Sequence, residues 1–400
     1  MTALAIVLLL AGVAGAVGRP FGLPAWVAPV SATAVGLVSG AARLAPSADA
    51  LRSLGGPIGF LLAAVPLSVL LDRLGFFAAA ATVLTSRSRS VGGLWILAAA
   101  VTTVLNLDAA VVLLTPLYIR IAHHRHLDGL VLASQPLILS WLASSALPVS
   151  NLTNLIAASE TGATSVGFVE HLGLPSLVAV GVGWLCYRRV IRPGRLAPEA
   201  QQLDVHGRRA LAIGGTVVGL VLVGFIAGRD IAITEWEVAL AADVLLLAVL
   251  RGGYLPWRSV PLGTALVAAA LGVLATAAVT HVSVGGWLGG DSLAGLARTA
   301  GVAALAANLI NNLPALLIIA PALGHRSGPD LWAALVGVNM GPVLVVTATL
   351  ASLLWVDTVR RMDVEVRSLD VTRIGLRVGL PGAAAGLATL LLLHAAGIAG

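Results

Sequence analysis

The chain has 400 residues, of which 58% are hydrophobic and only 10% are charged, so a soluble globular protein is excluded. All 24 basic residues are arginine, and 18 acidic residues leave a net charge of +6. Because the arginines lie mostly between apolar runs, they indicate membrane topology rather than nucleic-acid binding. The single cysteine, Cys186, excludes an internal disulfide and a metal site made of several thiolates.

Apolar segments of membrane-crossing or nearly membrane-crossing length follow one another along the chain. They cover residues 2–18, 25–41, 57–71, 92–122, 130–157, 173–190, 209–227, 236–250, 259–281, 293–324, 331–356 and 379–399. We interpret the first segment as a transmembrane helix and not as a signal peptide, because no basic residue precedes it and further membrane-length segments follow. The sequence therefore predicts an all-helical, multi-pass protein of the cell (plasma) membrane.

Two of these segments are too long for one ordinary crossing and carry polar residues at their centres. The segment 92–122 contains Asn106-Leu107-Asp108, and the segment 293–324 contains Asn311-Asn312-Leu313-Pro314. A helical arm of roughly 14 residues on each side of the polar centre is too short to span the hydrocarbon core. We therefore expect each segment to enter the membrane and return as a re-entrant hairpin.

The arginines give the orientation of the first hairpin. Arg87 and Arg89 precede it, and Arg120 and Arg125 close it. Because cytoplasmic loops collect arginine, both ends of this hairpin belong on the cytoplasmic side. With two hairpins about ten crossings remain, both chain termini lie outside, and most of the arginines lie inside.

An odd number of crossings in each half means that the second half enters the membrane inverted relative to the first. The predicted first inverted repeat covers residues 1–191, with its hairpin at about 92–122 and an interrupted helix at 130–157. A basic cytoplasmic linker follows at 192–208. The second inverted repeat covers 209–400, with its hairpin at about 293–324 and its interrupted helix at 331–356.

In each half, polar residues interrupt the long crossing that follows the hairpin. An interrupted helix in lipid has free N–H and C=O groups, which are tolerated only where they line a cavity or bind something. We expect the bends and interruptions to meet near the midplane, where helix N-termini would bind an anion or a polar, oxygen-rich solute. The predicted solute-binding residues at these positions are Asn106, Asn151, Thr153, Asn154, Asn311, Asn312, Thr347, Thr349 and Ser352.

Each of these predictions has a structural alternative. An asparagine in a membrane helix can serve as an interhelical hydrogen-bonding group, and for Asn308 and Asn339 the two roles are evenly balanced. Asp108 is predicted to couple transport to protons or cations, because ionisable groups inside a membrane are costly and usually functional. The alternative for Asp108 is a helix cap. For Asp243, the other acid expected within the membrane, an interhelical polar contact is favoured.

At these residues the sequence resembles the arsenical pump membrane protein (ArsB-type) family of the ion transporter superfamily. The resemblance rests on the runs 106–116, 150–155, 311–314 and 337–355. It implies a scaffold and a transport region with two opposed hairpins, efflux of arsenite or antimonite driven by proton exchange, and an optional soluble ATPase partner. The first bend differs from the family pattern, since it reads Asn106-Leu107-Asp108 where ArsB-type proteins more often have adjacent Asn-Asp.

The sequence thus predicts a secondary active transporter, with proton-coupled arsenite or antimonite efflux as the first hypothesis. Trivalent arsenic is a neutral trihydroxide near neutral pH, which suits Asn, Thr and Asp rather than arginine, and one cysteine cannot supply three thiolates. The alternative is a transporter of citrate, another dicarboxylate or sulfate, coupled to sodium or protons. No enzyme motif occurs in the sequence, and we expect no metal and no cofactor. The expected partners are the solute, protons or sodium, the lipid bilayer and a second copy of the chain in a homodimer, with no nucleic acid.

Overall fold

The computed structural model describes residues 2–19, 22–86, 91–191, 204–227, 233–251, 257–279, 284–324 and 328–398. Within these residues the chain is helical and contains no strand. The helices are α1 (Thr2–Gly18), α2 (Val27–Val38), α3 (Leu44–Ser53), α4 (Gly55–Leu74), α5 (Phe76–Ser86), α6 (Gly92–Val104), α7 (Leu107–His124), α8 (Gly129–Leu142), α9 (Leu152–Thr161), α10 (Ser165–Phe168), α11 (Leu174–Cys186), α12 (Val205–Ala227), α13 (Glu235–Val249), α14 (Leu262–Val279), α15 (Leu293–Ile310), α16 (Asn312–Leu323), α17 (Pro329–Met340), α18 (Leu350–Arg361), α19 (Ser368–Ile374) and α20 (Leu380–Ala395).

Six helical stretches of the described chain are long and apolar enough to cross a membrane, and shorter apolar helices accompany them. The expected all-helical multi-pass fold is confirmed. Both interrupted helices are present: α8 and α9 are separated by the one-turn helix Pro148–Ser150, and α17 and α18 by the one-turn helix Val346–Ala348. Most of the expected basic linker, residues 192–203, lies outside the described residues, as do Arg87 and Arg89.

Several boundaries differ from those expected. The helices α3 and α5 were not predicted, because α3 has ten residues that include two serines, an aspartate and an arginine, and α5 has only 11 residues. Two crossings begin earlier than expected, at Ser165 and Ser368, and continue to Ile191 and Ala395. Near these starts lie π-helical turns at Val169–Gly173 and Gly375–Gly379, each of which contains a charged residue. Because of these charges, the apolar pattern did not indicate the first part of either helix.

The hairpins are asymmetric in length. The first arm α6 has 13 residues and the second arm α7 has 18, whereas α15 has 18 and α16 has 12. By length and composition α15 is a candidate membrane span, and α7 has the same length, so the expectation of arms of roughly 14 residues does not hold for these two helices. In each hairpin the two arms pack against each other.

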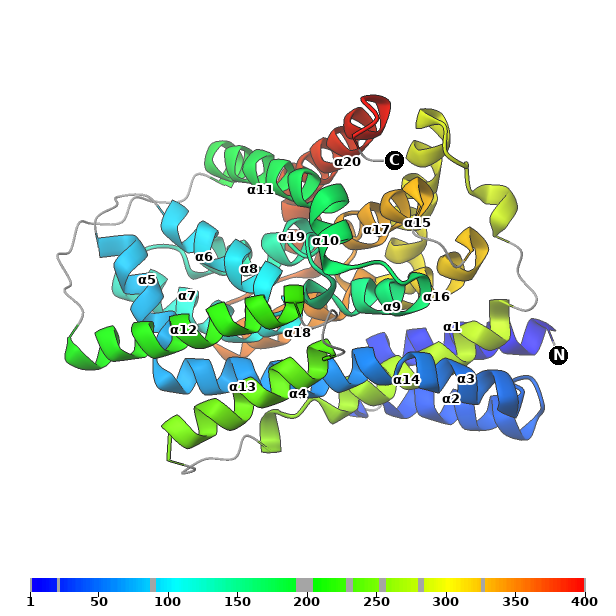
Figure 1. The fold of residues 1–400 in the computed structure, drawn as a ribbon, viewed down its shortest axis with the longest axis horizontal. Helices are drawn as coiled ribbons and strands as arrows, with labels where there is room; N and C mark the ends of the chain where they lie inside the picture. The colour runs from blue at the N-terminus through cyan, green and yellow to red at the C-terminus, as the bar shows by residue number, and fades with distance from the viewer. Residues whose placement is uncertain are drawn as a thin grey trace.

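The helices of the two halves pair in corresponding ways. Helix α1 packs on α2 and α12 on α13, while α4 packs on α13 and α14 on α2. The second part of each interrupted helix contacts the hairpin of the other half, α9 against α16 and α18 against α7. Figure 1 shows α1, α2, α3 and α14 together near the N-terminus, with α11 and α20 side by side on the opposite side of the molecule. We call α1–α5 with α12–α14 the scaffold.

Small residues allow α15 and α17 to pack closely against each other. Gly337 of α17 lies against α15, and a Cβ added there would clash with the carbonyl oxygen of Ala300 and lie 2.7 Å from the Cβ of Ala303. Close backbone approach of this kind is how membrane helices gain packing energy, because lipid provides no hydrophobic driving force between them. The α15–α17 contact thus fixes the second hairpin against its interrupted helix.

Candidate functional site

The first hairpin bends at Asn106, which caps the N-terminus of α7. Its side-chain oxygen accepts a hydrogen bond of 2.8 Å from the backbone N–H of Asp108. Its Nδ2 lies 3.5 Å from the carbonyl oxygen of Val149, the central residue of the one-turn helix between α8 and α9. Asn106 therefore ties the bend of the hairpin to the interruption of the next helix.

The second hairpin bends at Asn311 with the same pattern of bonds. Its side-chain oxygen accepts from the N–H of Leu313 at 3.2 Å, and its Nδ2 donates to the carbonyl oxygen of Thr347 at 3.0 Å. Thr347 is the central residue of the one-turn helix between α17 and α18. Asn311 has a φ of 79°, a left-handed conformation that asparagine tolerates better than most residues.

A second hydrogen bond joins each hairpin to the C-terminal end of the helix that precedes the interruption. Three residues before the first bend, the Thr103 hydroxyl donates to the carbonyl oxygen of Ala143 at 2.9 Å. Three residues before the second bend, Asn308 donates to the carbonyl oxygen of Gly341 at 2.9 Å. These carbonyls belong to the C-cap residues directly after α8 and α17, so the hairpins supply donors that the interrupted helices lack.

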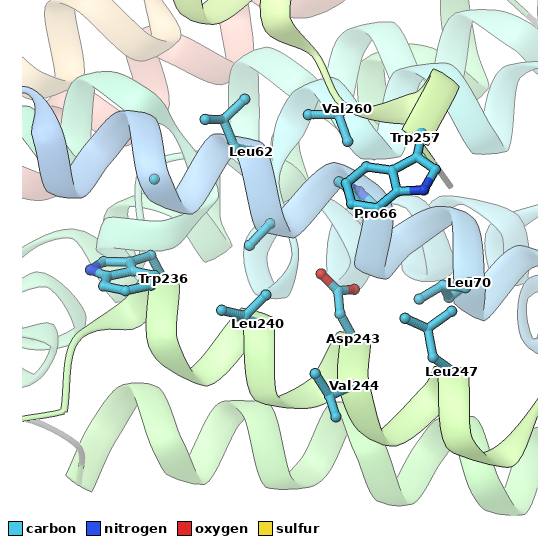
Figure 2. A pocket seen from close by; sticks show the side chains of 12 residues that line it. Leu62, Pro66, Leu70, Trp236, Leu240, Asp243, Val244, Leu247, Trp257 and Val260 are labelled. Carbon is cyan, nitrogen blue, oxygen red and sulfur yellow. The ribbon is translucent and has the colours of Figure 1, made fainter. Parts of the chain in front are cut away.

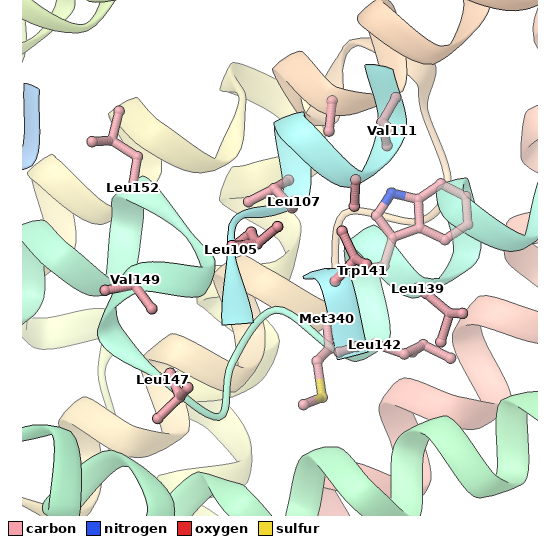
Figure 3. Packing of buried hydrophobic residues seen from close by; sticks show 14 of the residues in the cluster. Leu105, Leu107, Val111, Leu139, Trp141, Leu142, Leu147, Val149, Leu152 and Met340 are labelled. Carbon is pink, nitrogen blue, oxygen red and sulfur yellow. The ribbon is translucent and has the colours of Figure 1, made fainter. Parts of the chain in front are cut away.

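The first bend lies in apolar surroundings, which exclude water from the hydrogen bonds of Asn106. Figure 3 shows Leu105 and Leu107 of the hairpin in one cluster with Leu147 and Val149 of the interruption and Met340 of α17. All of them are less than 9% exposed. Hydrogen bonds in such surroundings are costly to leave unmade, which favours a defined geometry.

Three of the predicted solute-binding residues lie in a buried network around Asn339. The Asn339 side-chain oxygen accepts from Asn151 at 3.0 Å and from Thr153 at 2.6 Å, and its Nδ2 donates to Asn154 at 2.6 Å. Asn154 also donates to the carbonyl oxygens of Ser144 and Leu147, both at 2.9 Å. The amide of Asn154 is thereby committed to protein partners.

Two further predicted residues also have protein partners. Thr349 caps α18 by accepting from the N–H of Ser352 at 3.0 Å, and the two hydroxyls are 2.8 Å apart. Ser352 in turn accepts from Nε1 of Trp141 at 3.2 Å. Of the nine predicted solute-binding side chains, only those of Asn312 and Thr347 have no hydrogen bond among the described residues.

Asp108, next to the first bend, is a third polar side chain without a hydrogen-bond partner in the described protein; we call such side chains open. It lies in the first turn of α7, is half-buried, and its carboxylate makes no hydrogen bond or ion pair within the described residues. The cap of α7 is Asn106, so the capping role considered for Asp108 belongs to its neighbour. The corresponding position after the second bend is Leu313, so only the first hairpin carries a carboxyl there.

Sequence reasoning missed two serines at the first interruption. The hydroxyls of Ser144 and Ser145 are fully buried and have no partner in the described structure. Their counterparts after the end of α17 are Pro342 and Val343, which have no hydroxyl. The only available signal was their position directly after the end of an apolar helix.

The arrangement combines donors, acceptors and helix dipoles without a cationic side chain. Helices α7, α9, α16 and α18 all begin at a bend or interruption, where free N–H groups favour an anion or a polar oxygen. No arginine is among the buried polar residues of the described chain. The described residues also contain no cluster of three or more His, Cys, Asp or Glu side chains that could hold a metal.

Comparisons with known proteins agree with this architecture. A family model described as "Citrate transporter" matches residues 1–359. The arsenical pump membrane protein of Yersinia enterocolitica is 27% identical over 94% of this chain and 95% of its own length. The arsenical pump membrane protein of Escherichia coli is 25% identical over 92% of this chain and 93% of its own length. Among solved structures, the YdaH transporter of Alcanivorax borkumensis shares the fold, with a TM-score of 0.61, 15% identity and 86% coverage of both chains.

Proposed function

Because this chain belongs to the citrate transporter family and is a secondary transporter, we propose that it exports arsenite and antimonite across the cell membrane in exchange for protons. The similarity to arsenical pump membrane proteins over nearly the whole chain supports this substrate. The arsenical pump resemblance of the runs at residues 106–116 and 337–355 also supports it.

The observation that carries the proposal is the chemistry of three side chains at the bends and at the second interruption that have no hydrogen bond to the described protein. They are the Asp108 carboxyl, the Asn312 amide and the Thr347 hydroxyl, which offer both donors and acceptors. A neutral trihydroxide presents O–H groups that such side chains can bind. A multiply charged carboxylate such as citrate would face Asp108 without a buried arginine to balance the repulsion.

Proton coupling is assigned to Asp108. A carboxyl without a fixed partner can bind a proton when the solute is absent and release it when the solute arrives. Because Leu313 occupies the corresponding place after the second bend, the coupling group belongs to one hairpin only. This asymmetry gives the two otherwise matching halves different roles.

A second candidate is transport of citrate or another small anion, coupled to sodium or protons. Two observations favour it: the description of the matching family model and the four helix N-termini at the bends and interruptions. In this case the backbone N–H groups at the helix N-termini would bind the anion, a role that arginine side chains have in many anion-binding proteins.

Transport into everted membrane vesicles distinguishes the two candidates. Vesicles from a host that lacks its own arsenical pump are loaded with an acidic interior, and the uptake of radiolabelled arsenite and of radiolabelled citrate is measured with and without a sodium gradient. We expect arsenite accumulation that collapses when nigericin removes the pH gradient. Citrate uptake driven by an inward sodium gradient, or by protons in parallel vesicles with an alkaline interior, without arsenite uptake in the acidic vesicles, would establish the second candidate instead.

A further inference from the structure

The scaffold contains a cavity that takes no part in the bends or interruptions. It lies between α4 and α13 and has a volume of about 310 Å³. Small-molecule sites have volumes of roughly 300–1,000 Å³ and are apolar with a few well-placed polar groups. Figure 2 shows Asp243 of α13 pointing between the two helices toward Pro66 of α4, with Leu240 and Leu247 on either side of it along α13.

Asp243 is the one charged residue among those that line the cavity. Its side chain is 6% exposed, and its Oδ1 has no hydrogen-bond partner in the described structure. The interhelical polar contact expected for Asp243 is therefore not made by the residues that the structure describes. A buried carboxylate without a partner is costly, so this position favours an occupant that supplies a hydrogen-bond donor.

Pro66 interrupts the backbone hydrogen bonding of α4 at the same cavity wall. Because proline has no N–H, it cannot donate to the carbonyl oxygen of Leu62 one turn earlier in α4. Both Leu62 and Pro66 line the cavity and face α13. Asp243 therefore faces a turn of α4 that lacks one backbone hydrogen bond.

Two tryptophans lie at the ends of the cavity. Trp236 is 37% exposed and Trp257 is 72% exposed, and both rings line the cavity. Trp236 packs on Gly59, where an added Cβ would lie 3.4 Å from the indole ring. Aromatic faces attract cations, most strongly when water is excluded, and indole rings are suited to the edge of a membrane.

We propose that this cavity binds an amphiphilic amine, whose nitrogen donates to the Asp243 carboxylate while its hydrocarbon part occupies the apolar space between α4 and α13. The charge of the amine balances the carboxylate, which a hydrocarbon or an alcohol cannot do. The site is separate from the bends and does not depend on the transported solute.

Binding of radiolabelled decylamine to the full chain in phosphatidylcholine nanodiscs tests the proposal, with empty nanodiscs as the background. We expect saturable binding to the wild-type protein and at least tenfold weaker binding to Asp243→Asn, which keeps the size of the side chain. Glu235→Gln, which removes an acid from the first turn of the same helix outside the cavity, is the matched control and should bind as the wild type does. Equal binding to Asp243→Asn, or equal competition by decanol, would overturn the proposal.

A second measurement on the wild-type protein keeps the test independent of the folding of any variant. A decylamine that carries a diazirine on its alkyl chain is photolysed in the same nanodiscs, and the labelled peptides are identified by mass spectrometry. Label is expected in residues 59–70 and 236–247 and should be displaced by unlabelled decylamine. Label distributed evenly over lipid-facing helices would contradict a specific site.

Discussion

Asn339 of α17 donates a hydrogen bond of 2.6 Å to Asn154 of α9. The corresponding hydrogen bond between the other two helices runs from Nε1 of Trp141 in α8 to the hydroxyl of Ser352 in α18, at 3.2 Å. Each donor is the second-last residue of its helix. The first part of each interrupted helix is therefore hydrogen-bonded to the second part of the other interrupted helix. The two interruptions thus form one structural unit.

Replacing Asn339 should destabilise this unit. Asn339→Ala leaves buried groups of Asn151, Thr153 and Asn154 without their partner, and each unmade buried bond costs about 1–3 kcal/mol. Thermal unfolding of the protein in detergent should therefore show a clearly lower Tm. Asn312→Ala removes an amide that has no hydrogen bond within the described residues, so it should reduce transport with little change in Tm. Equal losses of Tm in the two variants would show that the distinction between committed and open asparagines is wrong.

Replacing Asp108 should separate solute exchange from proton coupling. In Asp108→Asn the side chain keeps its size but cannot exchange a proton, so accumulation driven by a pH gradient should be lost. Solute counterflow without a gradient should persist, because the other open side chains remain. Asp49→Asn, which alters an exposed acid of α3, should leave both activities unchanged. Gradient-driven flux at the wild-type rate in Asp108→Asn would exclude this residue as the coupling group.

The α15–α17 contact should not tolerate a methyl group at Gly337. Gly337→Ala places a Cβ against the carbonyl oxygen of Ala300, and overpacking of this kind costs about 1–3 kcal/mol. Gly301→Ala is the matched control, since nothing lies within 4 Å of an added Cβ on that face of α15. We expect a lower Tm for the first variant and an unchanged or higher Tm for the second. The packing argument fails if both variants unfold at the same temperature.

The two ends of the first hairpin should be accessible from the same side of the membrane. Single cysteines are introduced as Gly92→Cys at the start of α6 and His126→Cys after α7, in a Cys186→Ser background. A membrane-impermeant maleimide should label both from the cytoplasmic side, as the flanking arginines predict. Labelling from opposite sides would make this segment a full crossing instead of a hairpin.

Much of the architecture could be predicted from the sequence, because it depends on short-range properties. The bends at Asn106 and Asn311 lie within the predicted polar centres, and both helix interruptions occur where polar residues break an apolar run. The helix α3 and the start of the long helix at Ser165 were missed, since neither is apolar enough to stand out. The candidate residues at the bends and interruptions were found in the same way, from polarity in an apolar setting.

The sequence by itself determined that this is a multi-pass membrane protein with two bent and two interrupted helical segments, because hydropathy and helix-breaking residues act locally along the chain. Only the tertiary structure decided which polar side chains are satisfied by protein. Asn154 and Asn312 read alike in the sequence, yet Asn154 is bound by Asn339, 185 positions away, while Asn312 stays open. The physical reason is that a buried hydrogen bond depends on which distant group packs opposite, and the order of residues along the chain does not contain that information directly.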